Sequence, residues 1–202
     1  MIKIALRPEP GTYNATVRQP GQKFLSSNPA PSGRDFKRHA YWNRAANDLY
    51  SEYSGICAYT SMHMVYPETI DHFKPKSKYP NLAYEWNNLR LCRGWVNVSK
   101  GDNEHVLDPF EVENTWFKLE LPSCLIKAAP GLSHEIKVKV NNTVNTLRLN
   151  SDDSLVQERC NILIAYARNQ ISQAFLAERY PFLAFQVAHQ GVEPRLQAIF
   201  KV

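Results

Sequence analysis

The sequence predicts an α+β protein in which a short unit of two strands and a helix is embedded between flanking helices and preceded by an extended N-terminal arm. Three observations lead to this prediction. Apolar residues recur at helical spacing on both sides of the middle of the chain. The runs between residues 56 and 103 are short and bounded by turn residues. Residues 1–33 are rich in Pro, Gly, Ser and Asn.

The segments before residue 56 are predicted as follows. Residues 1–33 form the extended arm, with room for a short strand at its start, because prolines interrupt them repeatedly. From Arg34 to about Tyr53 the apolar residues have near-helical spacing, which predicts an amphipathic helix. Ser54-Gly55 is expected to end this helix. The helix and the following short runs are assigned to one part of the protein, residues 34–107.

Residues 108–202 are predicted to form a mixed strand and helix part that packs on the core or on a partner. Thr115–Leu121 and Glu135–Val140 alternate between apolar and polar residues, so both are predicted as strands. A long helix is predicted from Ser151 to about Arg179, with Asp152 and Asp153 in its first turn, where the helix dipole favours carboxylates. Pro181 ends that segment, and one or two short helices follow.

Composition places few limits on function. The chain has 202 residues, of which 44% are hydrophobic and 21% charged, so it can bury a core. Its formal charge of +5 permits nucleic-acid binding without arguing for it. Between residues 70 and 102, six basic residues stand against three acidic ones, which would attract a phosphate backbone. No signal peptide or membrane span is visible, so we expect a cytoplasmic protein with reduced cysteines.

Asp71 and His72 are the first candidates for chemistry. Cleaving a phosphodiester requires an activated water, stabilisation of charge at phosphorus, and help for the leaving oxygen. A neutral histidine suits the first task, and a hard cation held by oxygen ligands suits the others. Adjacent residues of a strand point to opposite faces, so the carboxylate can face the cation while the imidazole flanks the substrate. Asn97, near the start of the predicted helix, can return as a second oxygen ligand.

The motifs TIDHFKPKS, WNNLRLC and VNVSKGD resemble those of the HNH, or ββα-metal, endonuclease family. The resemblance implies that His72 is the general base and that Asp71 and Asn97 are the metal ligands. It also implies that Asn88 is the central catalytic-site asparagine, which braces the loop carrying the base, with Asn87 as the alternative in register. One divalent ion, Mg²⁺ or Mn²⁺, would be the cofactor.

The resemblance extends beyond these motifs to Pro8-Glu9-Pro10, to YWNRAANDLYSEYSGICAYT and to NTLRLNSDDSLVQERCNIL. These segments are similar to the HNH subunits of Septu and retron antiphage systems. Such a subunit works with an ATPase called PtuA, and in retrons it belongs to a complex that contains RNA and DNA. The resemblance therefore implies an effector nuclease that an ATPase partner restrains.

The sequence departs from the family at its cysteines. Many HNH proteins of this kind hold a structural zinc with two C-x-x-C pairs, whereas here the positions read Cys57-Ala-Tyr-Thr60 and Cys92-Arg-Gly-Trp95. Two thiolates make a poor zinc site, since structural sites use four ligands, and His63 is a weak candidate for a third. We expect no structural zinc, with Cys57 and Cys92 acting as small buried apolar residues and Tyr59 and Trp95 packing the region.

Other interpretations remain open from the sequence. Five basic residues are predicted to hold the substrate backbone: Lys74, Lys76, Lys78, Arg90 and Lys100. The substrate can be DNA or RNA, including tRNA, because the chemistry at phosphorus does not require deoxyribose. Alternatively, the HNH core has decayed and the chain is a nucleic-acid-binding or regulatory subunit, in which case the purified protein would bind no divalent cation.

Overall fold

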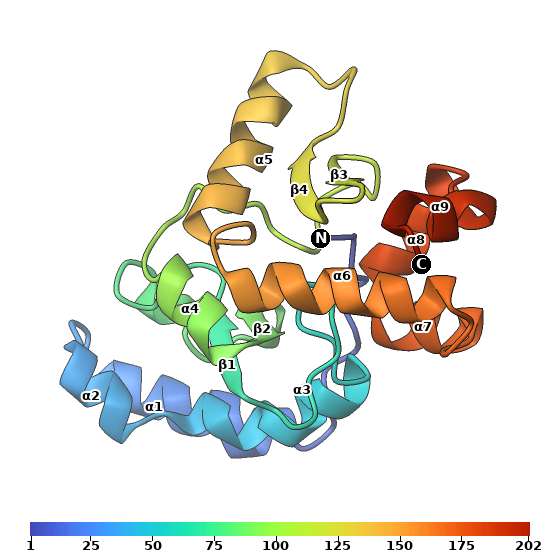
Figure 1. Cartoon of the computed structure of the whole chain (residues 1–202). Helices are drawn as coiled ribbons and strands as arrows, with labels where there is room; N and C mark the ends of the chain where they lie inside the picture. The colour runs from blue at the N-terminus through green and yellow to red at the C-terminus, as the bar shows by residue number, and fades with distance from the viewer. The chain divides into compact units, whose positions relative to one another are not determined.

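The computed structural model describes residues 1–202 and divides the chain into two compact units. We call residues Ala5–Ala58 and Met64–Glu104 the N-terminal unit, and residues Met1–Ile4, Tyr59–His63 and His105–Val202 the C-terminal unit. Each is α+β, with one small antiparallel sheet of two strands (Figure 1). None of the helices has both the length and the apolar character needed to cross a membrane.

The predicted N-terminal arm is partly helical: residues 1–10 contain no helix or strand, whereas helical turns begin at Tyr13. A π-helical segment, η1 (Asn14–Arg18), runs into α1 (Gln19–Ser27). The predicted extended conformation is therefore wrong for these residues, because Pro20 lies in the first turn of α1, where its missing N–H costs no helical hydrogen bond. Gly21 allows α1 to approach the ring of Tyr84, since a Cβ at Gly21 would lie 2.1 Å from Tyr84 Cγ.

Three short helices replace the continuous helix predicted over residues 34–53. They are α2 (Gly33–Arg38), the 3₁₀ segment η2 (Tyr41–Ala45) and α3 (Ala46–Glu52). The helix breaks at His39, whose backbone leaves the helical region at φ −116° and ψ 38°. The predicted end at Ser54-Gly55 is confirmed, because both residues have positive φ and turn the chain away from α3.

The two strands and one helix predicted in the middle of the chain are confirmed. Strand β1 (Thr69–His72) pairs antiparallel with β2 (Leu89–Cys92), and α4 (Gly94–Lys100) follows and packs against β1. The connection between the strands contains two 3₁₀ turns, η3 (Pro80–Leu82) and η4 (Trp86–Asn88). Gly101 ends α4 with φ 48° and ψ −131°, a conformation that favours glycine.

The C-terminal unit combines a hairpin with helices. Its elements are β3 (Phe117–Glu120), β4 (Leu125–Ala128), α5 (His134–Thr146), α6 (Asp153–Ala167), α7 (Gln173–Arg179), α8 (Pro181–His189), η5 (Glu193–Arg195) and α9 (Leu196–Phe200). The predicted strand at Thr115–Leu121 and the short C-terminal helices are confirmed. The predicted strand at Glu135–Val140 is wrong, because these residues belong to α5. The single long helix is also wrong, since α6 and α7 are separate.

Each unit has its own buried core. In the N-terminal unit, aromatic rings surround Tyr84, with Trp42, Tyr41 and Phe24 at centroid distances of 5.6, 5.9 and 6.4 Å. In the C-terminal unit, the buried guanidinium of Arg159 donates hydrogen bonds of 2.8 Å to the carbonyls of Cys124 and Leu149. Aromatic packing therefore supports the unit that carries the Asp71-His72 pair.

Candidate functional site

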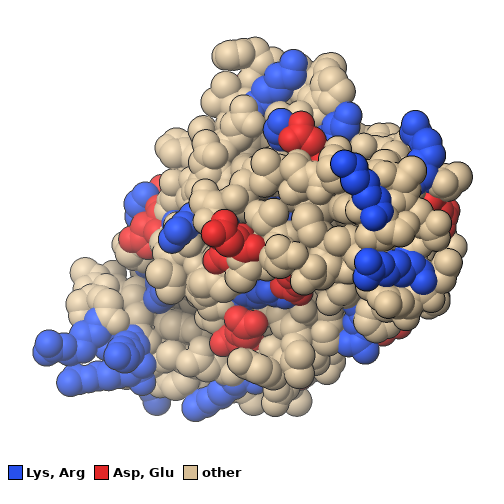
Figure 2. Space-filling model, viewed as in Figure 1, with Lys and Arg blue, Asp and Glu red and all other residues tan.

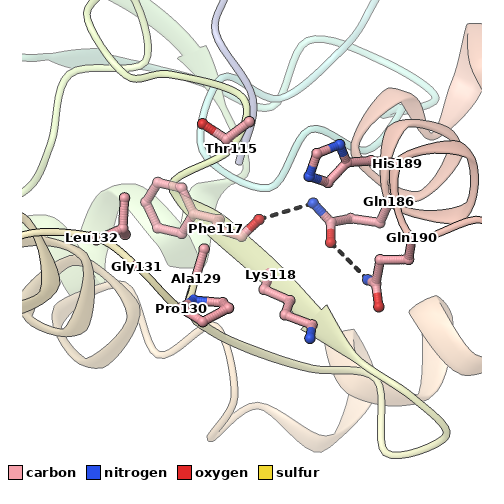
Figure 3. A pocket seen from close by; sticks show the side chains of 10 residues that line it. All are labelled: Thr115, Phe117, Lys118, Ala129, Pro130, Gly131, Leu132, Gln186, His189 and Gln190. Carbon is pink, nitrogen blue, oxygen red and sulfur yellow. Dashed lines mark hydrogen bonds between the residues drawn. The ribbon is translucent and has the colours of Figure 1, made fainter.

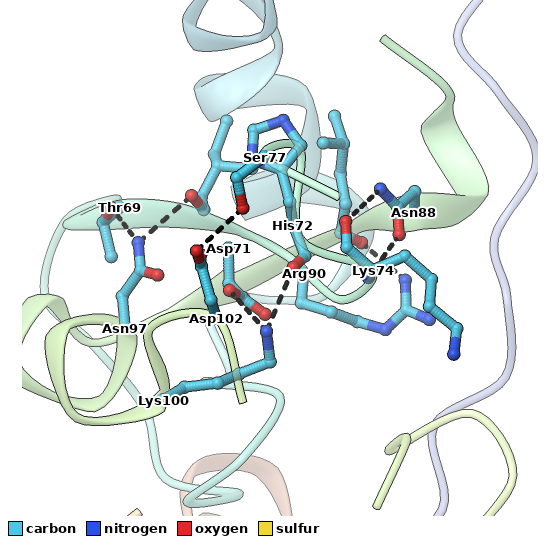
Figure 4. Close-up of polar contacts among 12 residues, drawn as sticks. Thr69, Asp71, His72, Lys74, Ser77, Asn88, Arg90, Asn97, Lys100 and Asp102 are labelled. Atoms are coloured by element: carbon cyan, nitrogen blue, oxygen red, sulfur yellow. Dashed lines mark hydrogen bonds and ion pairs between the residues drawn. The ribbon is translucent and has the colours of Figure 1, made fainter. Parts of the chain in front are cut away.

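Asp71 and His72 lie at the end of β1 and point to opposite sides of the strand (Figure 4). Both are buried, with 2% and 5% of their surface exposed. Lys100, at the end of α4, donates from Nζ to Asp71 Oδ1 and to the carbonyl of His72, each at 3.0 Å. The carboxylate therefore already has a cationic partner from the neighbouring helix.

The His72 imidazole is enclosed on the other side of the strand. Its Nε2 lies 2.9 Å from the Ala83 carbonyl, and its ring meets the Trp42 ring at a centroid distance of 4.6 Å and an angle of 89°. A carbonyl can only accept, so Nε2 carries the proton and the lone pair lies on Nδ1. Burial, followed by the charge of Lys76, lowers the pKa of His72 to about 3. The imidazole is thus neutral at physiological pH.

Asn88 closes the loop that connects the two strands. Its Oδ1 accepts from the backbone N–H of Lys74 at 2.8 Å, and its Nδ2 donates to the carbonyls of Lys74 and Leu82 at 3.1 and 3.0 Å. Asn88 is buried, whereas Asn87 is exposed. Of the two adjacent asparagines, Asn88 therefore fixes both ends of the loop that contributes Ala83 to His72.

Asn97 lies in the middle of α4 and faces β1. Its Nδ2 donates to Thr69 Oγ1 at 3.0 Å and to the Ile70 carbonyl at 3.2 Å. These two bonds fix the orientation of the amide, and Figure 4 shows its oxygen turned toward the side on which Asp71 and Asp102 are drawn. The structure thus brings Asp71, His72, Asn88 and Asn97 together on β1, α4 and the loop between the strands.

The oxygen donors of Asp71 and Asn97 suit a hard divalent cation better than a soft one. A carboxylate from Asp71 and an amide oxygen from Asn97 are the hard oxygen ligands that Mg²⁺ takes, and Mg²⁺ keeps several of its waters when few protein ligands are available. No group of three or more His, Cys, Asp or Glu side chains is arranged to hold a metal ion. Asp71 and Asn97 thus offer two oxygen donors of the kind that a hydrated Mg²⁺ ion takes, and Lys100 contacts one oxygen of the Asp71 carboxylate.

The five predicted phosphate-binding residues divide by exposure. Arg90 and Lys100 are buried, and Arg90 lies directly across from Asp71 in the sheet register, so neither presents its charge at the surface. Lys78 is about half exposed, with its Nζ 2.9 Å from Glu104 Oε2. Lys74 and Lys76 are partly exposed, and the Lys76 ammonium lies 5.4 Å from the centroid of the Trp42 ring.

The two cysteines of this region are buried. Cys57 and Cys92 are both 0% exposed, and the Ala58 N–H donates to the Leu91 carbonyl at 2.8 Å, which holds the two segments together. Burial raises the pKa of the Cys92 thiol well above its usual value. His63 belongs to the C-terminal unit, where its Nε2 contacts the Arg179 guanidinium. The thiols thus behave as apolar packing groups.

Three features of the site were not predicted from the sequence. They are the Asp71–Lys100 ion pair, the Ala83 carbonyl that orients His72, and the Trp42 ring against the imidazole. The sequence predicts that Lys100 holds the substrate backbone and does not predict its contact with Asp71. Nothing in the sequence signals the Ala83 carbonyl, because every residue has one.

A separate cavity of about 400 Å³ lies in the C-terminal unit beside β3 (Figure 3). Gln186 of α8 and Gln190, which follows the last residue of α8, line its polar side. Gln186 hydrogen-bonds the Leu119 N–H and the Phe117 carbonyl, and Gln190 donates to the Leu119 carbonyl, so both glutamines cover the edge of β3. None of the predicted site residues lines this cavity.

Fold and site together define an α+β protein with a buried Asp-His pair between two short strands and a helix. No protein-family model matches the chain. The chain is a distant homologue of Septu protein PtuB from Bacillus thuringiensis, with 31% identity over 94 residues. The match covers 45% of this chain and 34% of the length of that relative.

Proposed function

We propose that the chain is a metal-dependent endonuclease of the HNH type that hydrolyses phosphodiester bonds in nucleic acid. One observation carries this proposal. Asp71 and His72 end the same strand with their side chains on opposite faces, and α4 brings Asn97 against that strand. A neutral imidazole beside oxygen ligands for a cation is the minimum set for metal-assisted hydrolysis at phosphorus.

His72 supplies the base in this mechanism. With Nε2–H donating to the Ala83 carbonyl, the lone pair on Nδ1 accepts the proton of the attacking water, and the carbonyl then stabilises the imidazolium. Burial is the main cause of the lowered pKa of His72, so the imidazole becomes a stronger base when water and substrate enter. A divalent cation on Asp71 and Asn97 would supply Lewis-acid stabilisation of the charge on the phosphate oxygens.

The partly exposed lysines near the site are proposed to hold the substrate backbone. Three lysines follow His72 within six residues: Lys74, Lys76 and Lys78. They belong to the loop between β1 and β2, which the side chain of Asn88 closes. Their contacts would be to phosphate, which DNA and RNA share, so the substrate class is nucleic acid without a preference for either sugar.

The homology to Septu protein PtuB supports a place in antiphage defence. We propose that the chain is the effector subunit of a Septu-type complex with a PtuA-like ATPase. Because the match covers 34% of that relative, the activity and the partner of the whole relative are proposals for this chain.

The proposed function is tested by cleavage of plasmid DNA and of tRNA with Mg²⁺ or Mn²⁺, by the chain alone and with its ATPase. We expect Asp71→Asn, His72→Asn and Asn97→Ala each to reduce cleavage about a hundredfold or more, which is the usual contribution of a general base. The matched control is Asn87→Ala, which changes an exposed asparagine beside Asn88 and should cut within about twofold of wild type.

Circular dichroism would establish that each variant folds. Undiminished cutting by folded His72→Asn would refute the assignment of the base. If no variant and no wild-type preparation cuts nucleic acid or binds a divalent cation, the chain is instead a regulatory subunit with a decayed site.

A further inference from the structure

The ammonium of Lys100 is enclosed completely within the N-terminal unit. Its side chain is 0% exposed, and that of Asp71 is 3% exposed. Nζ donates to Asp71 Oδ1 and to the His72 carbonyl, and it lies 5.8 Å from the centroid of the Phe73 ring. One lysine thus contacts the carboxylate, the backbone of the base and the residue after it.

The position of Lys100 follows from the helix that carries Asn97. Residues three apart lie on the same face of a helix, so Asn97 and Lys100 both face β1. Asn97 bonds the Thr69 side chain and the Ile70 carbonyl, and Lys100 bonds the next two residues of the strand. Gly101 then turns the chain away with a positive φ. Helix α4 is therefore fastened along the whole of β1 by two side chains.

A carboxylate that already binds an ammonium is a weaker ligand for a divalent cation. The two positive charges would repel each other at contact distance, and the repulsion is strong in a buried environment. Removing the ammonium without replacing it would take away the cation that contacts the buried carboxylate at 3.0 Å, which is destabilising. Either the Lys100 ammonium or a divalent cation can therefore neutralise the Asp71 carboxylate, and each weakens the binding of the other.

We propose that Lys100 is a positioning residue that holds the Asp71 carboxylate and competes with the divalent cation for it. This inference rests on the proposed function, because it assumes that Asp71 is a cation ligand. Without the cation, Lys100 neutralises Asp71 and keeps α4 on β1. When the cation binds, the ammonium gives up Oδ1, so Lys100 sets how tightly the cation is held.

The test is calorimetric titration of the purified protein with Mn²⁺, which requires no cleavage. Lys100→Met keeps the length of the side chain and removes its charge. We expect it to bind Mn²⁺ at least about tenfold more tightly than wild type, because the competing charge is gone. Lys139→Met is the matched control: it removes the same charge from a half-exposed lysine of α5 that is paired with Glu135, and it should bind within about twofold of wild type.

Two further measurements keep the proposal testable if Lys100→Met folds poorly without cation. The double variant Asp71→Asn/Lys100→Met has no buried unpaired charge, and we expect it to fold and to lose Mn²⁺ binding. In the wild type, the ¹⁵Nζ resonance of Lys100 should be observable because the ammonium is shielded from solvent. It should shift or disappear as Mg²⁺ is added, whereas the backbone amide resonance of Lys139 in α5 should not.

Equal or weaker Mn²⁺ binding by Lys100→Met, or an unchanged Lys100 resonance at saturating Mg²⁺, would overturn the competition. The proposed function would then stand if wild type still bound the cation and cut nucleic acid. Tighter binding by Lys100→Met together with no cleavage by any preparation would instead support the competition and contradict the nuclease. Absence of cation binding in both proteins would overturn both.

Discussion

At the scale of single residues, the most constrained group is the His72 imidazole. Trp42 covers its ring, the Ala83 carbonyl takes its one N–H, and burial lowers its pKa to about 3. In the unfolded chain the same group would have a pKa of about 6.5. Folding therefore excludes a proton from His72 throughout the range between these two values.

This exclusion predicts how stability depends on pH. Between the folded and unfolded pKa values, the unfolded chain binds more protons, so the free energy of unfolding falls as the pH is lowered below about 6.5. His72 alone should account for a loss of about 2 kcal/mol between about pH 6.5 and 4.5. Urea denaturation in chelator should show that His72→Asn lacks this part of the loss.

The matched control for this prediction is His134→Asn, which changes an exposed histidine at the start of α5 and should keep the wild-type pH dependence. If His72→Asn and wild type lose stability in parallel over this range, the imidazole is accessible to protons in the folded protein. The enclosure described for Trp42 and Ala83 would then be wrong.

The residues of the site could be named from the sequence, but their interactions could not. Asp71, His72 and Asn97 are candidates because of the chemistry of their side chains, and Asn88 is a candidate because of the resemblance to the HNH family. The role of Lys100 depends on the packing of α4 against β1, which joins residues 29 positions apart. The sequence pattern does not show that packing, so the prediction for the same lysine is a contact with the substrate backbone.

At the scale of elements, the prediction for residues 135–140 was wrong because strand-like alternation and helical spacing of apolar residues overlap there. Ile136, Val138 and Val140 alternate with lysines, which predicts a strand, yet the buried residues of α5 are Val140, Thr143 and Val144, a helical spacing. The Ser133 side chain accepts from the Ile136 N–H and starts the helix. The N-cap and the later apolar residues therefore outweigh a short alternation.

The boundary between α6 and α7 has a local cause that apolar spacing does not reveal. Asn169 adopts a positive φ of 58°, which ends α6, and the Ser172 side chain accepts from the Phe175 N–H to start α7. The middle strands were predicted well because β1 and β2 are short and bounded by turn residues.

Helices α1 and α2 carry a basic surface, defined by the exposed residues Lys23, Arg34, Lys37 and Arg38. Figure 2 shows basic side chains gathered at the lower left, where Figure 1 draws these two helices. Asp35 is held in a capping box by Ser32. Phe36 of α2 packs on Trp42, whose ring contacts His72, so one aromatic residue separates this helix from the base.

We expect this basic surface to contact the substrate backbone. The double variant Arg34→Glu/Lys37→Glu should weaken binding to duplex DNA and reduce the salt dependence of the binding constant by about two units of slope, since each lost phosphate contact removes about 0.9. Fluorescence anisotropy over a range of salt concentrations measures both quantities. Lys118→Glu/Arg148→Glu makes the same charge change at exposed residues of the C-terminal unit and should leave the slope unchanged. An equal loss in both double variants would indicate a general effect of net charge.

At the scale of the whole molecule, the chain shares 94 aligned residues with its distant homologue, so an assembly cannot be transferred by homology alone. If the chain is the effector subunit of a Septu-type complex, a tagged form expressed with a PtuA-like ATPase should co-elute with it on size exclusion. Mass spectrometry of the eluted complex would identify the partner. His72→Asn should retain the partner while losing cleavage, because the imidazole is buried within the N-terminal unit.

Elution of the tagged chain by itself, with full nuclease activity, would contradict the proposed partnership. The same elution profile without any activity would favour a subunit that needs a different partner.

The contact between Trp42 and His72 also bears on the timing of any reaction at this site. His72 is 5% exposed and its ring contacts the Trp42 ring, so we expect the tryptophan to move when water reaches the imidazole. The turnover rate then cannot exceed the rate of this local motion of Trp42, however fast the proton transfer itself is. A substrate or partner that loosens the tryptophan would shorten the waiting time before each cut without contacting the histidine.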